Sequence, residues 1–235
     1  MKKIKYALIM AAGRGTRMLP LTQTIPKAMV PLNGSTLIAS GLKYLKKHIP
    51  HVYATVGYKG PLLAQHLIEE DVSGMFNTTG HDNAWWIFNT LMREVNEPIF
   101  VLTCDNVIEL DFDLITDEYF SLGAPPCMLV PVKPVTGLDG DYIKHEGNVV
   151  KSLSRSQPSE MYCSGIQVLQ PRQLNLKMPP VTNFYDVWNN LIKNGDLYCG
   201  DIYPKKWFAL DTLQQLQEFS TQSQQFEWLT PGKSV

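Results

Sequence analysis

A glycine-rich loop directly after a short apolar run is the feature that most constrains the fold of this 235-residue chain. The run Tyr6–Met10 is apolar along its length, which is typical of a strand buried on both faces. Gly13 and Gly15 follow it, and because glycine tolerates positive φ and has no Cβ, a large anion can approach the backbone closely there. Arg14 and Arg17 add guanidinium groups, which bind phosphate oxygens in pairs. The segment is therefore interpreted as a strand followed by a triphosphate-binding loop.

The spacing of this loop differs from that of two common nucleotide-binding loops. Met18 stands where the third glycine of a dinucleotide-binding fingerprint would fall. The Gly-Lys-Ser/Thr ending of a P-loop is absent as well. The remaining alternative is a tight turn whose arginines only face solvent.

The whole string around the loop resembles the signature of the nucleotidyltransferases that make NDP-sugars and related activated head groups. It reads Ala-Ala-Gly-x-Gly-Thr-Arg-Met-x-Pro from Ala11, and it continues with Pro26-Lys27 and Val30-Pro31. In that family the loop wraps the NTP phosphates, the arginine grips the leaving pyrophosphate, and the lysine bridges the reacting phosphates. The resemblance implies these catalytic roles for Arg17 and Lys27. It also implies a nucleotide-binding loop made of Ala11, Ala12, Gly13, Arg14, Gly15, Thr16 and Arg17.

Charge and composition argue against two classes of partner. The net charge is −1 and 18% of the residues are charged, so the chain lacks the basic surface that nucleic acids and anionic membranes attract. No apolar run approaches the roughly 20 residues needed to cross a bilayer. The four cysteines are far apart, which indicates reduced thiols rather than a zinc site. A signal peptide would remove the glycine loop, so none is predicted, and we expect a cytoplasmic monomer or homodimer.

Strand and helix patterns alternate along the chain, which predicts a mostly parallel sheet with right-handed crossovers. After the first strand we expect strands at 52–57, 98–103, 127–133, 161–170, 197–203 and 207–210, a loop with a hairpin at 137–148, and helices at 36–47, 61–70, 110–122, 183–194 and 212–219. Ser35 is the predicted N-cap of the first of these helices. The predicted fold is a single α/β domain over residues 1–235, with a three-layer α/β/α, Rossmann-like, mixed and mostly parallel sheet. We also expect a small β lid at about 131–170 and a mobile tail at 220–235.

Two aspartates are candidate metal ligands. Asp105 directly follows an apolar strand, where open parallel sheets place their ligands, and Mg²⁺ takes one or two protein carboxylates beside phosphate oxygens. The string Thr103-Cys104-Asp105 resembles the metal motif of the family, and Trp207-Phe208-Ala209-Leu210-Asp211-Thr212 resembles its second metal-binding string. The resemblance implies a Mg²⁺ cofactor held by Asp105 and Asp211. The alternatives are a turn residue for Asp105 and a helix N-cap for Asp211, which Thr212 could equally supply.

The interval 77–91 departs from the sugar-phosphate branch of the family. It resembles the Asn-x-x-x-Ser-Phe segment of the phosphocholine-type cytidylyltransferases, with Asn83 at the matching asparagine. An Asn amide could read a pyrimidine edge with one donor and one acceptor. Trp85 and Trp86 could line a pocket for an ammonium group by cation–π contact. The alternative is that these tryptophans form the apolar face of a helix, and for at least one of them we favour it.

The acceptor-binding residues are implied by resemblance. Gly140-Asp141-Tyr142 resembles the loop that closes over the sugar or head group, and Tyr162-Cys163-Ser164-Gly165-Ile166 resembles the Asn-Ala-Gly-Ile string. The implied acceptor contacts are Trp85, Asp141, Tyr142, Ser164 and Gly165. A glycine in a strand can also mark only a β-bulge. The lysine of the usual Glu-Lys-Pro string is not matched, because Ser156-Gln157-Pro158 occupies that interval, and Lys133 and Lys144 are candidates for holding the acceptor phosphate.

The resemblance implies a Mg²⁺-dependent nucleotidyltransferase of the EC 2.7.7 type. It would transfer NMP from an NTP to a phosphorylated small-molecule acceptor, a sugar 1-phosphate first, and release pyrophosphate. Such a reaction would supply precursors of a bacterial surface polysaccharide or cell envelope. Two alternatives stay open: a cytidylyltransferase acting on phosphocholine or a similar phosphoester, and a non-catalytic NTP-sensing domain.

Overall fold

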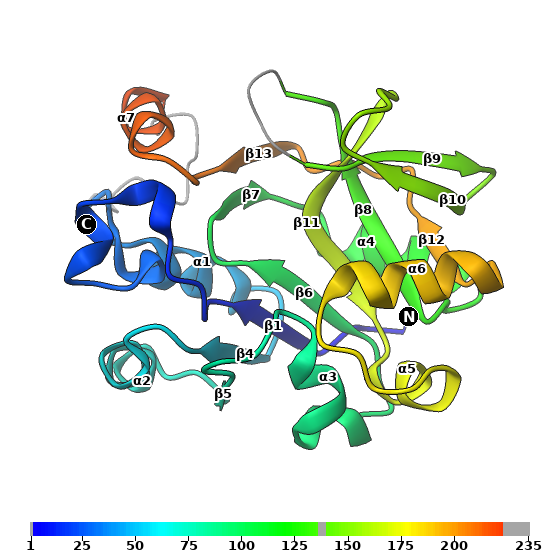
Figure 1. The fold of residues 1–235 in the computed structure, drawn as a ribbon, viewed down its shortest axis with the longest axis horizontal. Coiled ribbons are helices and arrows are strands. Elements are labelled where there is room, and N and C mark those ends of the chain that lie inside the picture. Colours follow the sequence, from blue (N-terminus) through cyan, green and yellow to red (C-terminus); the bar gives the residue numbers. More distant parts are fainter. Residues whose placement is uncertain (1, 136–139, 223–235) are drawn as a thin grey trace. The chain divides into compact units, whose positions relative to one another are not determined.

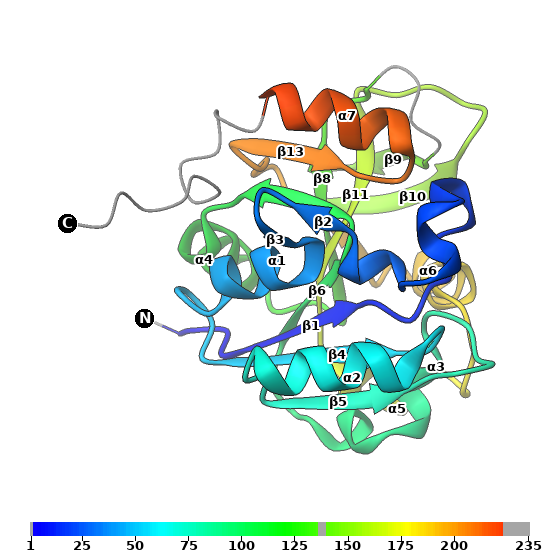
Figure 2. The ribbon, with the colours of Figure 1, turned by 90° about the vertical axis from the view of Figure 1, so that its left-hand side faces the viewer.

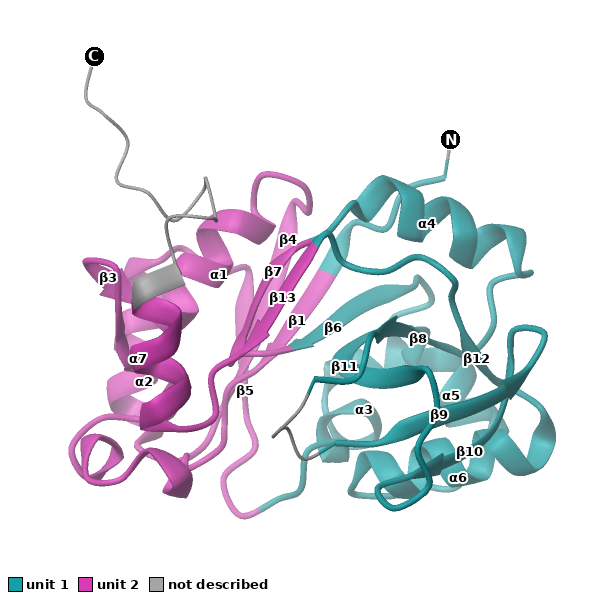
Figure 3. Ribbon diagram, turned by 90° about the horizontal axis from the view of Figure 1, so that it is seen from above, with its two compact units in different colours: residues 1–6, 81–102, 110–205 teal, residues 7–80, 103–109, 206–235 magenta. Residues whose placement is uncertain are grey.

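The structure is a computed structural model that describes residues 2–135 and 140–222. The chain forms two compact units, each of which is described by itself (Figure 3). Unit 1 comprises residues 1–6, 81–102 and 110–205, and unit 2 comprises residues 7–80, 103–109 and 206–235. Each unit is therefore assembled from segments that are far apart in the sequence.

Unit 2 contains the glycine loop and the strand that leads into it. Its strands β1 (Tyr6–Met10), β4 (His51–Val56) and β5 (Gly74–Asn77) follow the order β5-β4-β1, and β4 and β5 are parallel. Helix α2 (Gly60–Glu69) packs beside β4 (Figure 2). The unit also contains α1 (Leu37–Leu45), α7 (Leu213–Gln222), the two-residue strands β2 (Pro31–Leu32) and β3 (Ser35–Thr36), and the antiparallel pair β7 (Asn106–Glu109) and β13 (Lys206–Ala209).

The N-cap of α1 is Thr36, so the prediction of Ser35 is wrong. The Thr36 hydroxyl accepts a hydrogen bond from the backbone N–H of Ala39 at 3.2 Å. Ser35 instead pairs with Leu32 in the β2–β3 ladder, which ends the extended backbone one residue later than predicted. Serine and threonine are both common N-cap residues, and the register of the β2–β3 ladder places Thr36 rather than Ser35 at the N-cap position.

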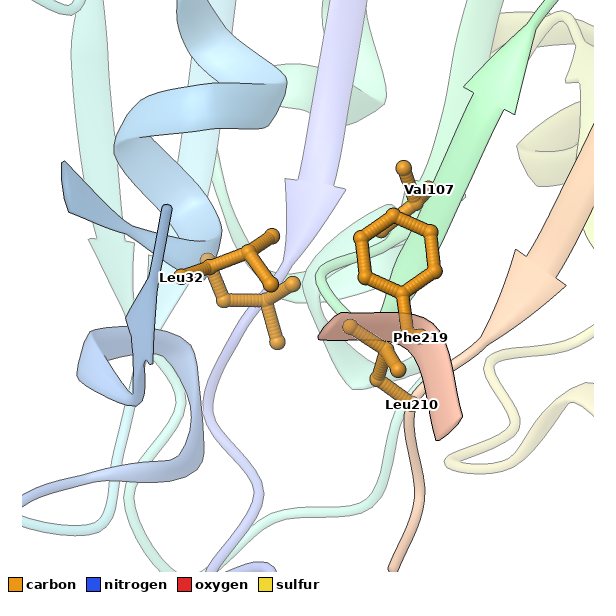
Figure 4. Packing of buried hydrophobic residues seen from close by; sticks show 5 residues of the cluster. Leu32, Val107, Leu210 and Phe219 are labelled. Carbon is orange, nitrogen blue, oxygen red and sulfur yellow. The ribbon is translucent and has the colours of Figure 1, made fainter. Parts of the chain in front are cut away.

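A buried apolar cluster joins the three segments of unit 2. It contains Leu32, Leu37, Val107, Leu210 and Phe219, with Phe208 and Leu216 packed against it (Figure 4). The backbone N–H of Leu210 also donates to the carbonyl oxygen of Asp105 at 2.9 Å. Because Leu210 precedes Asp211 and Val107 lies two residues after Asp105, the cluster brings these two aspartates to the same place.

Unit 1 is built on strands in the order β6-β11-β8-β12-β10-β9. The strands are β6 (Ile99–Thr103), β8 (Cys127–Val132), β9 (Tyr142–Glu146), β10 (Val149–Ser154), β11 (Met161–Leu169) and β12 (Leu197–Cys199). Strand β11 runs antiparallel to β6, β8 and β9, whereas β12 is parallel to β8 (Figure 1). Its helices are α3 (Trp85–Asn89), α4 (Phe112–Ser121), α5 (Pro171–Lys177) and α6 (Phe184–Asn194).

The predicted α/β fold with a mixed, mostly parallel, Rossmann-like sheet is confirmed. The hairpin is the pair β9–β10 over residues 142–154, so its second strand lies beyond the predicted interval 137–148. It lies with the start of β11 in the predicted lid interval. Residues 136–139 of that interval and 223–235 of the predicted mobile tail lie outside the described residues. The single-domain assignment stays a prediction. Within residues 2–135 and 140–222, no helix has both the length and the apolar character required to cross a membrane.

Replacing Phe219 by Ala should lower the free energy of unfolding by about 3 kcal/mol, because a fully buried aromatic side chain is removed from the cluster. Chemical denaturation measures this change. The matched control is Gln217→Ala on the exposed face of α7, which should change the same free energy by less than about 0.5 kcal/mol. Equal effects of the two substitutions would show that α7 does not contribute to the core of unit 2.

Candidate active site

The glycine loop is anchored to the end of β4. The backbone N–H of Ala11 donates to Thr55 Oγ1 at 3.0 Å, and that of Tyr58 donates to the carbonyl oxygen of Ala12 at 2.9 Å. A Cβ atom on Gly57 would lie 2.7 Å from the same carbonyl oxygen, so only glycine allows this approach. The loop therefore leaves β1 with its first residues fixed on the neighbouring strand.

The absence of a side chain at Gly15 makes room for the Lys27 side chain, which packs against the loop. Gly15 has φ 67° and ψ 46°, the left-handed conformation that side chains disfavour. A Cβ atom on Gly15 would lie 2.6 Å from Lys27 Cβ, which is closer than real Cβ contacts. The Thr22 hydroxyl donates to the Gly15 carbonyl oxygen at 2.8 Å and holds this turn in place. Glycine is thus required at position 15 for two reasons: the backbone is left-handed there, and the Lys27 side chain leaves no room for a Cβ atom.

The Lys27 ammonium is shared by the two predicted metal ligands. Lys27 Nζ donates to Asp105 Oδ2 at 2.5 Å and to Asp211 Oδ1 at 2.6 Å, and Lys27 is only 8% exposed. Arg17 Nη2 donates to the same Asp211 oxygen at 2.8 Å, with its side chain more than half exposed. The four residues to which the sequence analysis assigned catalysis and metal binding therefore lie together, at the end of the glycine loop in unit 2.

These contacts shift the pKa values of the buried groups. Burial is the largest effect on Lys27 and lowers its pKa, but the charges of Asp105 and Asp211 and the hydrogen bond to Asp105 are chief among the effects that outweigh it, so the pKa of Lys27 is raised. Burial is also the largest effect on Asp105 and raises its pKa. The net pKa of Asp105 is nevertheless lowered, mainly by the charge of Lys27 and by its hydrogen bond. Burial raises the pKa of the Cys104 thiol to about 12, so this cysteine is a neutral neighbour. The site therefore carries a charged lysine and a charged aspartate at neutral pH.

The donor set around Lys27 fits a divalent cation that also binds phosphate. Within the described residues, no group of three or more His, Cys, Asp or Glu side chains could hold a metal ion. Two carboxylate oxygens both contact one ammonium nitrogen here, so they lie close to each other. Mg²⁺ is bound by one or two carboxylates with phosphate and water oxygens as its other ligands. Asp105 and Asp211 are therefore a suitable pair for Mg²⁺ and a poor site for zinc.

Asp211 is not the N-cap of α7. The Thr212 hydroxyl accepts from the backbone N–H of Gln215 at 3.2 Å, while Gln215 Oε1 accepts from the N–H of Thr212 at 3.0 Å. This reciprocal pair is a capping box, and its Thr-x-x-Gln pattern is visible in the sequence. The Asp211 carboxylate is therefore not needed to cap α7 and accepts hydrogen bonds from Lys27 and Arg17 instead.

Asn83 and Trp85 belong to unit 1, whereas the glycine loop belongs to unit 2. Asn83 Oδ1 accepts from the backbone N–H of Phe184 at 3.0 Å, so the amide oxygen contacts the first residue of α6. Trp85 stacks on His81 with ring centroids 3.9 Å apart, and Trp86 is 1% exposed. Trp86 is therefore a core residue, as favoured for one of the two tryptophans. The roles of Asn83 in base reading and of Trp85 in acceptor binding stay predictions.

The predicted acceptor residue Asp141 lies in a polar cluster of unit 1. The Tyr185 hydroxyl donates to Asp141 Oδ2 at 2.7 Å, and Arg155 Nη2 donates to the Tyr185 hydroxyl at 2.8 Å. Arg155 Nε lies 3.8 Å from Asp141 Oδ1, and the Tyr185 ring contacts Trp188 edge to face. Arg155 and Tyr185 were not among the predicted site residues, because no local pattern in the sequence links them to Asp141.

The other predicted acceptor residues are also in unit 1. Tyr142 contacts Tyr162 edge to face, with ring centroids 5.2 Å apart. Ser164 and Gly165 interrupt the register of β11 on β8, Gly165 has φ 79°, and the Ser164 hydroxyl donates to the Val130 carbonyl oxygen at 2.6 Å. Gly165 therefore lies in a β-bulge, as the alternative proposed. A bulge changes the direction of neighbouring side chains, so this finding is compatible with an acceptor contact. Within the described residues, Lys144 Nζ donates to Gln157 Oε1 at 2.9 Å.

Comparison with known proteins identifies a family and several relatives. The pattern of the nucleotidyl transferase family matches residues 6–140. The chain is 24% identical over 247 residues to mannose-1-phosphate guanyltransferase beta-A of Xenopus laevis, which covers 96% of this chain and 68% of that protein. It is 31% identical over 125 residues to choline-phosphate cytidylyltransferase of Streptococcus pneumoniae, which covers 52% of this chain and 55% of that one.

The same fold occurs in a solved structure, the inositol-1-phosphate CTP transferase from T. maritima. The TM-score is 0.78 at 16% identity, over 100% of this chain and 99% of the other. At that identity the likeness concerns the fold alone. The chain also spans 27% of the length of the bifunctional protein GlmU of Methanococcus aeolicus, with which it shares 25% identity over 112 residues and 48% of its own length.

Replacing Gly15 by Ala should lower the free energy of unfolding by about 2–3 kcal/mol, because the left-handed strain adds to the clash with Lys27. Gly34→Ala is the matched control: Gly34 has φ +79° but nothing lies within 4 Å of its Cβ position. It should lower the same quantity by only about 1 kcal/mol. Urea denaturation of both variants measures the difference, and equal losses would mean that Lys27 does not constrain the loop.

The contribution of the Lys27–Asp105 pair to stability should depend on pH at the extremes only. The pKa of Asp105 is lowered on folding. Asp105 therefore stabilises the folded state above the unfolded pKa of about 4, and this stabilisation is lost as the pH falls through the lower folded pKa. Because the pKa of Lys27 is raised, its contribution is present below the ordinary lysine pKa and is lost as the pH rises through the raised value. The stability difference between wild type and Asp105→Asn, measured in EDTA, should be flat from about pH 5 to 9 and shrink below about pH 4. A difference that changes across neutral pH would contradict a charged pair.

Proposed function

The chain belongs to the nucleotidyl transferase family, and on that premise we propose that it transfers a nucleoside monophosphate from an NTP to a phosphorylated small-molecule acceptor. The observation that carries the proposal is the convergence of Lys27, Asp105 and Asp211 at the end of a glycine loop. A cation poised between carboxylates beside an open backbone loop is suited to binding and neutralising a polyphosphate.

The proposed reaction needs positioning and charge neutralisation rather than a general base. A phosphate oxygen of the acceptor attacks the α-phosphorus of the NTP, a new P–O bond forms, and the bond to the pyrophosphate oxygen breaks. The acceptor phosphomonoester is already anionic at neutral pH, so no proton has to be removed from it. The raised pKa of Lys27 keeps its ammonium charged for contact with the reacting phosphates, and Arg17 would bind the leaving pyrophosphate.

Asp105 and Asp211 would hold the proposed Mg²⁺ cofactor. Bound there, the ion supplies a Lewis acid that neutralises charge on the phosphate oxygens. The Lys27 ammonium now supplies the positive charge between these two carboxylates. Lys27 would contribute a second positive charge beside the phosphates, on a side chain that is long and flexible.

We propose a sugar 1-phosphate as the acceptor. The mannose-1-phosphate guanyltransferase of Xenopus laevis aligns with 96% of the chain, which supports this class. The product would then be a nucleotide sugar for a surface polysaccharide or cell envelope, made by a cytoplasmic monomer or homodimer.

A phosphocholine-like acceptor with CTP is the second candidate. The carboxylate of Asp141 lies beside Tyr185, whose ring contacts Trp188. A carboxylate beside aromatic rings can bind a cationic group, and Arg155 takes that place here, with its guanidinium 5.8 Å from the centroid of the Tyr185 ring. The choline-phosphate cytidylyltransferase of Streptococcus pneumoniae, 31% identical over half of this chain, supports the same reading.

Pyrophosphate release in the presence of Mg²⁺ tests the function directly. Each NTP is to be combined with glucose 1-phosphate, GlcNAc 1-phosphate, mannose 1-phosphate, MurNAc 1-phosphate and phosphocholine. We expect release with one NTP and a sugar phosphate; turnover only with CTP and phosphocholine would establish the second candidate. NTP binding by calorimetry without release from any pair would favour a non-catalytic NTP-sensing domain.

Asp105→Asn should lower kcat by at least about 100-fold, because the variant keeps the shape of the side chain but loses the charge that the reaction needs. Lys27→Ala should lower kcat more than it weakens NTP binding. Asp71→Asn is the matched control, since Asp71 has a fully exposed side chain in unit 2 and should retain wild-type kcat. Near-wild-type turnover of Asp105→Asn would remove Asp105 from the metal site.

A further inference from the structure

A short turn after β4 contacts the glycine loop in several places. Gly57 packs on Ala12, and the backbone N–H of Tyr58 donates to the Ala12 carbonyl oxygen. The Tyr58 hydroxyl donates to the carbonyl oxygen of Thr22 at 3.1 Å, and Thr22 in turn donates to Gly15. Tyr58 is therefore hydrogen-bonded to Ala12 at the start of the loop and to Thr22, which holds Gly15.

The ring of Tyr58 carries two positively charged side chains. Arg14 Cζ lies 5.3 Å from its centroid, and Lys59 Nζ lies 5.5 Å from it. None of the ion pairs formed by residues 2–135 and 140–222 includes Arg14 or Lys59. Both cations therefore lie near one aromatic ring, and no carboxylate of the described residues is within ion-pair distance of either. An anion bound at this ring would supply the missing counter-charge.

The backbone of Lys59 is held in a conformation that lysine disfavours. Lys59 has φ 49° and ψ 39°, in the left-handed region, and is the N-cap of α2 without a side-chain cap bond. Asn33, Asp71 and Ala124 also have positive φ, and of these residue types asparagine and aspartate tolerate it well. Glycine or asparagine would suit position 59 better on backbone grounds, so the charged side chain is what lysine adds there.

We propose that Arg14 and Lys59 form an outer cationic pair that binds the terminal phosphates of the NTP, with Tyr58 as the positioning residue that holds both side chains at the loop. The inference rests on the proposed function, because that function brings a triphosphate to this loop. It assigns Lys59 and Tyr58 to the recognition of the pyrophosphate moiety, beyond the contact proposed for Arg17. The bound β- and γ-phosphates supply the negative charge that the pair lacks.

Calorimetric titration of the full chain with inorganic pyrophosphate in MgCl₂ tests the pair. Lys59→Asn, which tolerates the backbone conformation but removes the charge, should raise the Kd for pyrophosphate by about tenfold. Lys59→Arg should stay within about twofold of wild type. Lys47→Asn removes an exposed lysine elsewhere in unit 2 and should leave the Kd unchanged. In turnover assays, Lys59→Asn should raise the KM of the NTP and leave the KM of the acceptor unchanged.

Two further variants separate binding from folding. Lys59→Gly should raise the Kd for pyrophosphate as Lys59→Asn does, while its Tm equals or exceeds that of wild type, because the backbone strain is relieved. Tyr58→Phe keeps the ring and should bind pyrophosphate within about twofold of wild type, whereas Tyr58→Leu should lose about fivefold. A merely structural role for Tyr58 would make both variants lower the Tm without this difference in affinity.

The outcomes distinguish this inference from the proposed function. If the wild type binds pyrophosphate and NTP, and Lys59→Asn binds pyrophosphate with the same Kd, the outer cationic pair is overturned. The proposed transferase function is unaffected by that result. Restored binding in Lys59→Arg together with the loss in Lys59→Asn would support the outer cationic pair. Wild-type protein that binds neither NTP nor pyrophosphate would overturn both.

Discussion

The shared contact of one buried lysine with two aspartates is the interaction on which unit 2 depends. Asp105 lies 78 residues after Lys27, and Asp211 lies 184 residues after it. Bringing such distant groups together reduces the freedom of long loops, and a buried carboxylate without a partner is strongly unfavourable. The ammonium contacts both carboxylates at once, so removing it would leave the Asp105 carboxylate without the charge that lowers its pKa. Apolar packing by Leu210 and Phe219 holds the backbone in the position that makes the contact possible.

The lysine also explains features of the glycine loop that phosphate binding alone would not require. The absence of a side chain at Gly15 makes room for the stem of Lys27, and the Thr22 hydroxyl holds the turn from the other side. Thr55 and Tyr58 tie the start of the loop to β4. The loop is thus prepared before any anion reaches it, because its conformation is set by contacts within unit 2. Prepared sites lose less conformational entropy on binding.

The sequence predicted the parts of this structure that depend on local pattern. Pattern and spacing predicted the strand into the loop and the long helices. Resemblance singled out Lys27, Asp105 and Asp211, whose side chains are in contact in the structure, while their catalytic and metal-binding roles stay predictions. Strands β5 and β7, of four residues each, were missed because they are too short to show a period. The contact of Arg155 and Tyr185 with Asp141 was missed because it depends on how distant strands and helices pack. The cap of α1 was misplaced by one residue because strand register, which the sequence does not display, decided it.

The order of the segments of unit 2 along the chain has a consequence for synthesis on the ribosome. The glycine loop and Lys27 are made first, Asp105 follows 78 residues after Lys27, and Asp211 follows 184 residues after it. The segment that carries the glycine loop therefore leaves the ribosome well before the carboxylates that complete its site. A nascent chain cannot hold a substrate in the finished geometry until Asp211 has been made, so a product that stops before it would lack the assembled centre.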